Sequence, residues 1–219
     1  MERIPELELM DDPAQALAYA RADFSTPHNH FIDLVARHFG PGLHGSILDL
    51  GCGPGDICRR FVQRFPDCRI HAVDASTPML ELARADTEAA ALDQRIDYFL
   101  AYLPAAQLPL QHYDLLMSNS LLHHLAEPAG LWECIKNHGQ TGSLVFVMDL
   151  LRPANRAQAE QLATLYASDE PALLQQDFLN SLLAAYRPGE VREQLLQHGL
   201  GQLHIDVVSD RHFIVFGNL

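Results

Sequence analysis

Three closely spaced glycines carry the clearest chemical signal in the sequence. Gly51, Gly53 and Gly55 follow directly after the apolar run 46–50, and Asp56 opens the next segment of helical period. A strand that ends in a glycine-rich turn and a helix holds a ligand at the carboxyl edge of a sheet, because glycine lets the backbone approach and the helix N-terminus offers free N–H groups. We therefore expect a small-molecule site at this turn.

The spacing of the glycines restricts which ligand is expected. A dinucleotide site has the pattern G-x-G-x-x-G, in which the third glycine permits close helix packing beside a pyrophosphate. Here the third glycine comes one position early, and Asp56 stands in the expected place. An acidic side chain disfavours a pyrophosphate, which argues against a nicotinamide-dependent oxidoreductase. For the glycines alone, a tight strand-to-helix turn without a ligand is the structural alternative.

The elements that must position this turn alternate between strands and helices. Short apolar runs alternate with longer segments of helical period, which is typical of βαβ units and a parallel sheet. Run 143–150 has too few polar positions for a face in water and predicts a strand buried on both sides. The predicted strands are 46–50, 68–74, 95–100, 113–118 and 143–150, followed by a tight antiparallel hairpin of 203–208 and 211–216.

Three stretches resemble motifs of the class I S-adenosylmethionine-dependent methyltransferases. Residues 47–55 (ILDLGCGPG) look like the family's first motif, and residues 73–80 (VDASTPML) look like its acidic strand end with the following helix. Residues 113–125 (YDLLMSNSLLHHL) resemble its fourth strand and the next loop. The resemblance spans roughly residues 45 to 150, and the terminal hairpin agrees with the family's reversed last strand. It implies S-adenosylmethionine as cofactor, with S-adenosylhomocysteine as its product.

The resemblance also implies a fold. We expect an α/β protein with a Rossmann-like, seven-stranded, mostly parallel sheet, an antiparallel last strand and helices on both faces. Residues 1–219 form a single methyltransferase domain in this interpretation. Its parts are an N-terminal helical cap (1–42), the cofactor-binding core (43–150), a helical lid insertion after the fifth strand (151–188), and the last helix with the terminal hairpin (189–219).

The same resemblance implies roles for single residues of the first two motifs. The backbone around Gly51, Cys52 and Gly53 would face the methionyl part of the cofactor, and Asp49 would brace that loop. Asp74 lies 19 residues past the third glycine. There, its carboxylate would accept hydrogen bonds from both ribose hydroxyls.

The expected adenine pocket departs from the family pattern at one position. Ala75 and Met79 would lie beside the adenine. Family members commonly have an acidic residue just after the third strand that accepts a hydrogen bond from the adenine amino group, whereas residues 99–104 read FLAYLP. We hypothesise that Tyr102, which follows Ala101, packs against the adenine instead. A partly buried loop tyrosine without this role is the alternative.

The reaction itself demands little of the side chains. A sulfonium is an activated methyl donor, so the acceptor mainly has to be held behind the methyl carbon. Ser118 and Asn119 would close the methionine end. A general base matters only if the acceptor must lose a proton. His123, next to His124, is the catalytic candidate because an imidazole changes protonation near neutral pH. The alternative is a structural histidine pair at a helix start.

Two segments outside the motifs are expected to shape the acceptor site. The cap and the insertion flank the carboxyl edge of the sheet, where family members build their acceptor pockets. We predict an apolar or aromatic pocket for a small-molecule acceptor. Ordinary helix packing or a dimer surface also explains the apolar stripe of the insertion, so a homodimer stays open. The candidate wall residues are Tyr19, Arg21, Phe24 and His28 of the cap and Tyr166, Phe178 and Tyr186 of the insertion.

Composition narrows the class of protein and its partners. The chain has 219 residues, of which 48% are hydrophobic and 20% charged, which is typical of a soluble globular protein. Fifteen basic against 28 acidic residues leave a formal net charge of −13 without a basic patch, so we expect no nucleic-acid partner. No apolar segment approaches the ~18–20 residues of a membrane span, and a signal-peptide pattern is missing. We expect a cytoplasmic protein without a membrane partner.

The four cysteines show neither a C-x-x-C pair nor zinc-ligand spacing, so we expect reduced thiols, no disulfide and no metal. The predicted function is methyl transfer from S-adenosylmethionine to an O, N or C atom of a small molecule. A non-catalytic protein that binds S-adenosylmethionine or S-adenosylhomocysteine, as a regulatory or partner subunit, is the alternative from a different class.

Overall fold

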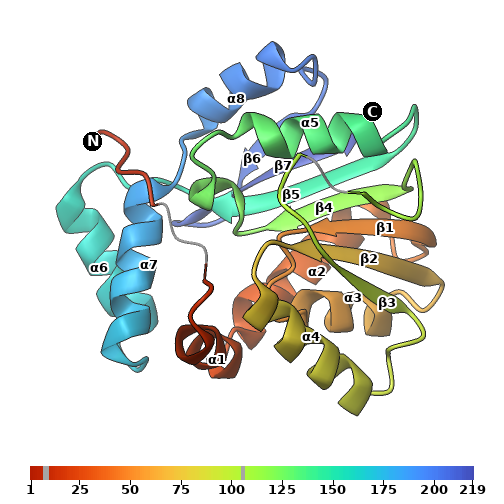
Figure 1. Ribbon diagram of the computed structural model, residues 1–219. Helices are drawn as coiled ribbons and strands as arrows, with labels where there is room; N and C mark the ends of the chain where they lie inside the picture. Colours follow the sequence, from red (N-terminus) through yellow and green to blue (C-terminus); the bar gives the residue numbers. More distant parts are fainter. Residues whose placement is uncertain (7–9, 105–106) are drawn as a thin grey trace.

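The structure is a computed structural model that describes residues 1–6, 10–104 and 107–219. A seven-stranded sheet forms its centre, with helices on both faces (Figure 1). The strands are β1 Gly45–Leu50, β2 Cys68–Asp74, β3 Ile96–Leu100, β4 Leu115–Asn119, β5 Leu144–Leu150, β6 His204–Val207 and β7 His212–Asn218. The helices are α1 Pro13–Arg21, α2 Ser25–Phe39, α3 Asp56–Arg64, α4 Thr77–Ala89, the 3-10 helix η1 Leu122–His124, α5 Ala129–His138, α6 Arg156–Ala167, α7 Ala172–Ala184 and α8 Pro188–Gln197.

The directions of the strands confirm the predicted sheet, which is mostly parallel with an antiparallel last strand. Across the sheet the strands follow the order β3-β2-β1-β4-β5-β7-β6. Neighbouring strands are parallel from β3 to β5, and β7 runs antiparallel to both β5 and β6. The chain moves outward from β1 to β3 and then returns to β4 on the other side of β1. Such a reversal opens a crevice at the carboxyl ends of the two strands that flank it, here β1 and β4.

Two helical layers bury the two faces of the sheet. Phe31 of α2, Phe61 of α3 and Leu80 of α4 belong to one apolar cluster, on the face that these helices cover (Figure 1). Trp132 of α5 and Leu195 of α8 belong to the cluster on the other face. Each fully buried side chain of this size contributes ~2–3 kcal/mol through removal from water. The sheet is thus a rigid base for the loops at its carboxyl edge.

The N-terminal helices occupy different places. Helix α1 packs against α4, whereas α2 packs against α3 and lies on a face of the sheet, where the Phe31 ring contacts the Phe146 ring of β5 edge to face at a centroid distance of 5.1 Å. The division of the chain into cap, core and insertion remains a prediction.

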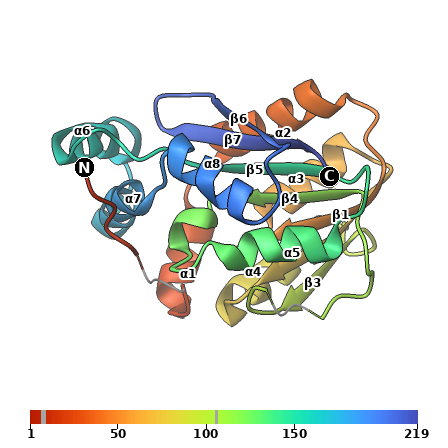
Figure 2. The same ribbon diagram turned by 90° about the horizontal axis from the view of Figure 1, so that it is seen from above.

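The insertion folds on itself at one end of the sheet. Helices α6 and α7 pack together, and both views show them with the N-terminus at the same end of the molecule (Figures 1 and 2). Leu162 of α6 and Leu182 of α7 share an apolar cluster with Leu150, the last residue of β5. The insertion thus packs against the carboxyl end of β5. Among the described residues, no helix combines the length and the apolar character that a bilayer span requires.

Candidate active site

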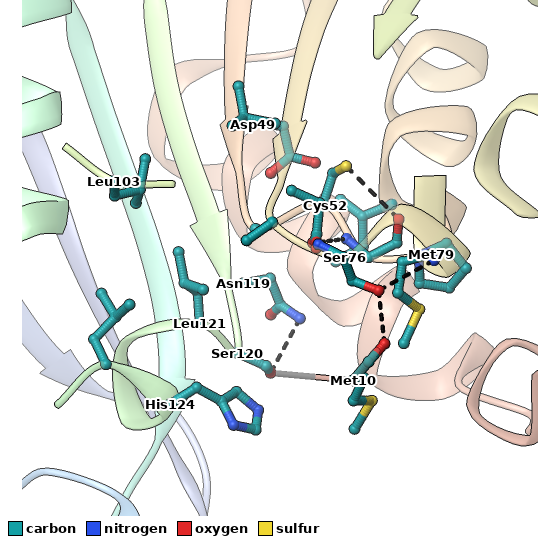
Figure 3. Close-up of a pocket in the computed structure, with 18 of the residues that line it drawn as sticks. Met10, Asp49, Cys52, Ser76, Met79, Leu103, Asn119, Ser120, Leu121 and His124 are labelled. Carbon is teal, nitrogen blue, oxygen red and sulfur yellow. Dashed lines mark hydrogen bonds between the residues drawn. The ribbon is translucent and has the colours of Figure 1, made fainter. Parts of the chain in front are cut away.

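A cavity of about 400 Å³ lies at the carboxyl ends of β1, β2 and β4 (Figure 3). In Figure 3 the loop after β4, with Ser120 and His124, faces the segment after β2, with Ser76 and Met79. Most residues predicted to bind the cofactor line this cavity. They are Asp49, Gly51, Cys52, Gly53, Asp74, Ala75, Met79, Ala101, Tyr102 and Asn119.

The glycine-rich turn combines close packing with an open backbone. All three glycines have positive φ, and a Cβ atom added at Gly51 would lie 2.8 Å from the Leu121 side chain. A Cβ atom at Gly55 would collide with the Tyr98 hydroxyl. At Gly53, by contrast, it would meet no heavy atom within 4 Å. Gly51 and Gly55 therefore let the turn pack tightly, whereas Gly53 presents bare backbone to the cavity.

Asp74 ties this turn to the segment after β2. Its Oδ2 atom accepts a hydrogen bond from the Gly53 N–H at 2.8 Å, and its Oδ1 atom accepts one from the Ser76 N–H at 2.8 Å. Burial raises the pKa of Asp74 despite these hydrogen bonds. A carboxylate offers about four lone-pair positions, so acceptor capacity remains for a ligand. Hydroxyl groups of a ligand are suitable donors for this carboxylate.

Asp49 is a buried carboxyl group at the base of the cavity. It is 3% exposed and accepts a hydrogen bond from the Cys58 thiol at 2.9 Å. Burial raises the pKa of Asp49 to about 7, and the charge of Asp74 acts in the same direction. A cation bound beside it would favour the ionised form. This side chain is thus suited to a ligand that carries a positive group.

The first turn of α2 contributes an oriented imidazole. The Nδ1 atom of His28 lies 2.6 Å from Oδ2 of Asp56, and the Nε atom of Arg60 donates to the same oxygen at 2.7 Å. Burial acts to raise the pKa of Asp56, but the hydrogen bonds from His28 and Arg60 outweigh it and lower this pKa to about 2. Asp56 therefore remains an acceptor that fixes the ring of His28, which lines the cavity.

The cap contributes fewer residues to the cavity than the sequence predicted. Tyr19 lines it, and burial raises the pKa of its phenol to about 12, so the hydroxyl stays protonated. Arg21 and Phe24 do not line the cavity. The ring of Phe24 instead braces those of Tyr19 and His28, at centroid distances of 4.7 and 5.5 Å.

The structure corrects the predicted role of His123. Its side chain is 2% exposed, does not line the cavity, and places Nδ1 2.7 Å from Oδ1 of Asp149. His124 is the member of the pair that lines the cavity (Figure 3). Burial and the neighbouring His123 hold the pKa of His124 well below 6.5, so its imidazole is neutral. A buried imidazole that faces a carboxylate cannot reach an acceptor in the cavity.

Ser118 is a second correction. It is fully buried inside β4, and its hydroxyl donates to the Leu50 carbonyl oxygen of β1 at 2.7 Å. Asn119, one residue further, lines the cavity as predicted and donates from Nδ2 to the Ser120 hydroxyl at 3.1 Å. Successive residues of a strand point to opposite faces, so the serine and the asparagine cannot both face the ligand.

None of the three insertion aromatics lines the cavity, which corrects the prediction of an aromatic wall. Tyr166 is partly exposed and donates to Asp210 at 2.7 Å, and Phe178 packs in the insertion's own cluster. Tyr186 donates to the Leu125 carbonyl oxygen at 3.3 Å, under the guanidinium of Arg3. The residues that the sequence did not single out as cavity walls include Met10, Leu121 and Leu125.

Met10 shows why such residues were missed. Its carbonyl oxygen accepts a hydrogen bond from the Ser76 hydroxyl at 2.6 Å, which brings it beside the predicted cofactor turn (Figure 3). It belongs to no motif and to no periodic segment. No signal in the sequence could have placed it here.

These features together fit the methyl donor implied by the sequence motifs. The bare backbone at Gly53 leaves room beside Asp49, which would meet the ammonium group of a methionyl tail. Asp74 has acceptor positions left for a ribose diol. Ala75, Met79 and Leu103 add apolar surface for a base. The residues present therefore suit S-adenosylmethionine.

Comparison with known proteins agrees with this fit. A family model described as a methyltransferase domain matches residues 47–140. The trans-aconitate 2-methyltransferase of Streptomyces avermitilis is 40% identical over 114 residues, which are 51% of this chain and 40% of that protein. Its namesake from Streptomyces coelicolor is 31% identical over 202 residues, 85% of this chain and 64% of that protein. The chain thus spans less than two thirds of these relatives.

A solved structure resembles almost the whole chain. The plantazolicin methyltransferase BpumL, in complex with a monoazolic desmethylPZN analog and SAH, has a TM-score of 0.70 at 16% identity, over 95% of this chain and 91% of that one. At this identity the likeness shows the fold alone. The match to a methyltransferase domain and this fold agree with the class I S-adenosylmethionine-dependent methyltransferase that the motifs predict. The solved structure holds SAH, which agrees with the predicted cofactor.

Proposed function

We propose that this chain is an enzyme that transfers the methyl group of S-adenosylmethionine to an O, N or C atom of a small molecule. The observation that carries the proposal is one cavity that is lined by Asp49, Gly53 and Asp74 and also by Tyr19 and His28. The first group suits the methyl donor. The second group leaves polar and aromatic surface for an acceptor.

Hydrogen bonds within the protein already orient the carboxyl groups that would hold the cofactor. The cofactor supplies a methyl group already activated on a sulfonium sulfur. The Gly53 and Ser76 N–H groups fix the Asp74 carboxylate in place. Its remaining acceptor capacity would hold the ribose hydroxyls. Asp49 would bind the ammonium group, and its own ionisation would follow from that contact. Correct placement of the acceptor can contribute ~7–11 kcal/mol of the barrier.

His28 replaces His123 as the side chain to accept a proton, where the acceptor must lose one. Asp56 accepts a hydrogen bond from the Nδ1–H group of His28, which leaves a lone pair on Nε2. A proton taken from the acceptor would then reside on Nε2, while Asp56 stabilises the imidazolium. This orientation by a carboxylate is the arrangement expected of a general base.

The charge of the cavity favours a neutral or cationic acceptor. Among the described residues that line it, three are aspartates and none is lysine or arginine. The two named relatives act on trans-aconitate according to their names. A tricarboxylate would meet carboxylates without a permanent cation, which is unfavourable in a partly buried site. Trans-aconitate is therefore the comparison compound and not our proposed acceptor.

Release of S-adenosylhomocysteine tests the proposal. The purified chain is incubated with methyl-labelled S-adenosylmethionine and a pool of cellular small molecules, and with trans-aconitate in a parallel reaction. We expect label in a product from the pool, and loss of that label with the Asp74→Ala variant. A chain that binds S-adenosylhomocysteine but transfers no label to any pool would instead support the non-catalytic binding protein.

A further inference from the structure

Three possible metal ligands converge beside the cavity from opposite halves of the chain. Glu6 lies in the N-terminal segment, and His123 and His124 form the end of η1. One ligand atom from each of these residues lies within 4.8 Å of the other two. The Glu6 side chain is 8% exposed and accepts a hydrogen bond from the Ser181 hydroxyl at 3.0 Å. The sequence offered no metal motif because the ligands come from distant positions.

The first imidazole is oriented for ligation by a buried carboxylate. Asp149 accepts hydrogen bonds from the backbone N–H groups of Leu122 and Leu150, at 2.7 Å each, and lies 2.7 Å from Nδ1 of His123. A carboxylate in this position holds the proton on Nδ1 and leaves the lone pair on Nε2. Histidines that bind metals nearly always donate their other N–H to such a partner.

The second imidazole has a buried nitrogen without a hydrogen bond. Among the described residues, no atom makes a hydrogen bond with Nδ1 of His124. This atom lies 3.8 Å from Oε2 of Glu6, which is too long for a hydrogen bond. A buried nitrogen in this state costs free energy unless it has a partner.

The distances suit a bound cation after a small adjustment. With metal–ligand bonds of ~2.0–2.2 Å, tetrahedral ligand atoms lie ~3.4 Å apart. The observed separation of Nδ1 of His124 from Oε2 of Glu6 is 3.8 Å. This pair needs a shift of a few tenths of an ångström, and the separations to the His123 ligand atom are at most 4.8 Å.

We propose that Glu6, His123 and His124 bind one divalent transition-metal ion, with Asp149 as the carboxylate that orients His123. Imidazole and carboxylate ligands together suit Zn²⁺, Fe²⁺, Co²⁺ or Ni²⁺ better than Ca²⁺ or Mg²⁺. The ion joins the N-terminal segment to η1. His124 lines the cavity, so the ion stiffens the wall that faces the acceptor. The proposal does not depend on methyl transfer.

Titration of the full chain with Co²⁺ alone tests this site. The protein is first stripped of metal with a chelator, and visible absorption reports coordination of Co²⁺ by protein ligands. We expect one ion per chain for the wild type, and at least tenfold weaker binding for Glu6→Gln and for His124→Asn. Glu2→Gln and His44→Asn are matched controls, because both residues are exposed and outside the cluster. They should bind Co²⁺ as the wild type does.

Thermal unfolding with and without Zn²⁺ gives an independent readout. Zn²⁺ should raise the Tm of the wild type and of both controls, but not of Glu6→Gln. Glutamine can still accept the hydrogen bond from the Ser181 hydroxyl, so this variant separates ligation from folding. If the wild type binds no stoichiometric Co²⁺, or if all five proteins bind it equally, the proposal is wrong.

Discussion

Two walls of the same cavity are built in different ways. At the cofactor wall, partners lie close in sequence: the Gly53 N–H donates to Asp74, and the Ser76 N–H donates to the same carboxylate. The other wall includes His124 and Leu125, and we call it the acceptor wall. Partners far apart in sequence hold it from behind, because Arg3 donates to the carbonyl oxygens of His123 and Ala184. The first wall is a local consequence of strand, turn and helix. The second exists only once the whole chain has folded.

This difference predicts that changes in the cofactor wall weaken cofactor binding strongly and leave the other wall intact. Asp74→Ala removes the acceptor of two backbone hydrogen bonds and of the expected ribose contact. Hydrogen bonds to a charged group contribute ~1.5–3 kcal/mol each, so we expect affinity for S-adenosylmethionine to fall about 100-fold or more. Isothermal titration measures this. Asp97→Ala, an exposed carboxylate on β3, is the matched control.

An Asp74→Ala protein that binds S-adenosylmethionine normally, with a normal Tm, would contradict this division of the cavity. A large fall in Tm would show instead that Asp74 mainly holds the two loops together. The conservative variant Asp74→Asn then decides, since its amide can still accept from one loop.

The second prediction concerns Asp49 and pH. Because burial raises its folded-state pKa to about 7 from the usual 3.8, this group favours folding fully below about pH 4, and the contribution is lost as pH rises through 7. Asp49→Asn cannot ionise, so its stability relative to the wild type should increase between pH 5 and pH 8, by ~3 kcal/mol. Urea unfolding at both pH values measures the difference.

The same substitution should weaken cofactor binding, because asparagine cannot pair with an ammonium group. If the Asp49→Asn variant is more stable but binds S-adenosylmethionine more weakly, Asp49 serves ligand binding and not stability. A stability difference that does not change with pH would show that Asp49 is already ionised in the free protein.

The third prediction addresses the acceptor wall. Arg3→Met keeps apolar contact with the Tyr186 ring but leaves the carbonyl oxygens of His123, Leu125 and Ala184 without this donor. We expect a loss of ~2 kcal/mol, or a Tm lower by roughly 4–8 °C, with little change in affinity for S-adenosylmethionine. Arg21→Met, at an exposed position, is the control. Equal losses of stability and cofactor affinity would mean that the two walls fold as one unit.

Most residues that the sequence assigned to the cofactor line the cavity, because the signals for this wall are local. Glycine spacing, strand ends and helix starts are all set within a few residues, as with the serine that caps α4 through the Met79 N–H. The incorrect predictions concern which face of a strand or turn a side chain occupies, and which residues it contacts. The fourth strand was expected to end at Ser118 but ends at Asn119, and a shift of one residue exchanges the faces of a strand. For the adjacent His123 and His124, the sequence likewise did not show which side chain faces the cavity.

The residues of the acceptor wall could not be predicted from the sequence, for a different reason. An amphipathic stripe such as that of α7 shows that a helix is packed, but not against what. Tyr186 was expected at the ligand and instead contacts Arg3, whose position near the N-terminus carries no pattern. Contacts between residues this far apart depend on the complete fold, so periodicity and motifs do not encode them.

The smallest expected effect concerns the adenine. Tyr102 lines the cavity and is 62% exposed, in a loop that lacks the family's usual acidic residue. Stacking of a base on an aromatic ring contributes ~1–3 kcal/mol, and the exposure of this ring favours the lower limit. Tyr102→Ala should therefore weaken S-adenosylmethionine about fivefold, and Tyr102→Phe should restore it. Equal affinity for all three proteins would show that the adenine is held by Ala75, Met79 and the backbone alone.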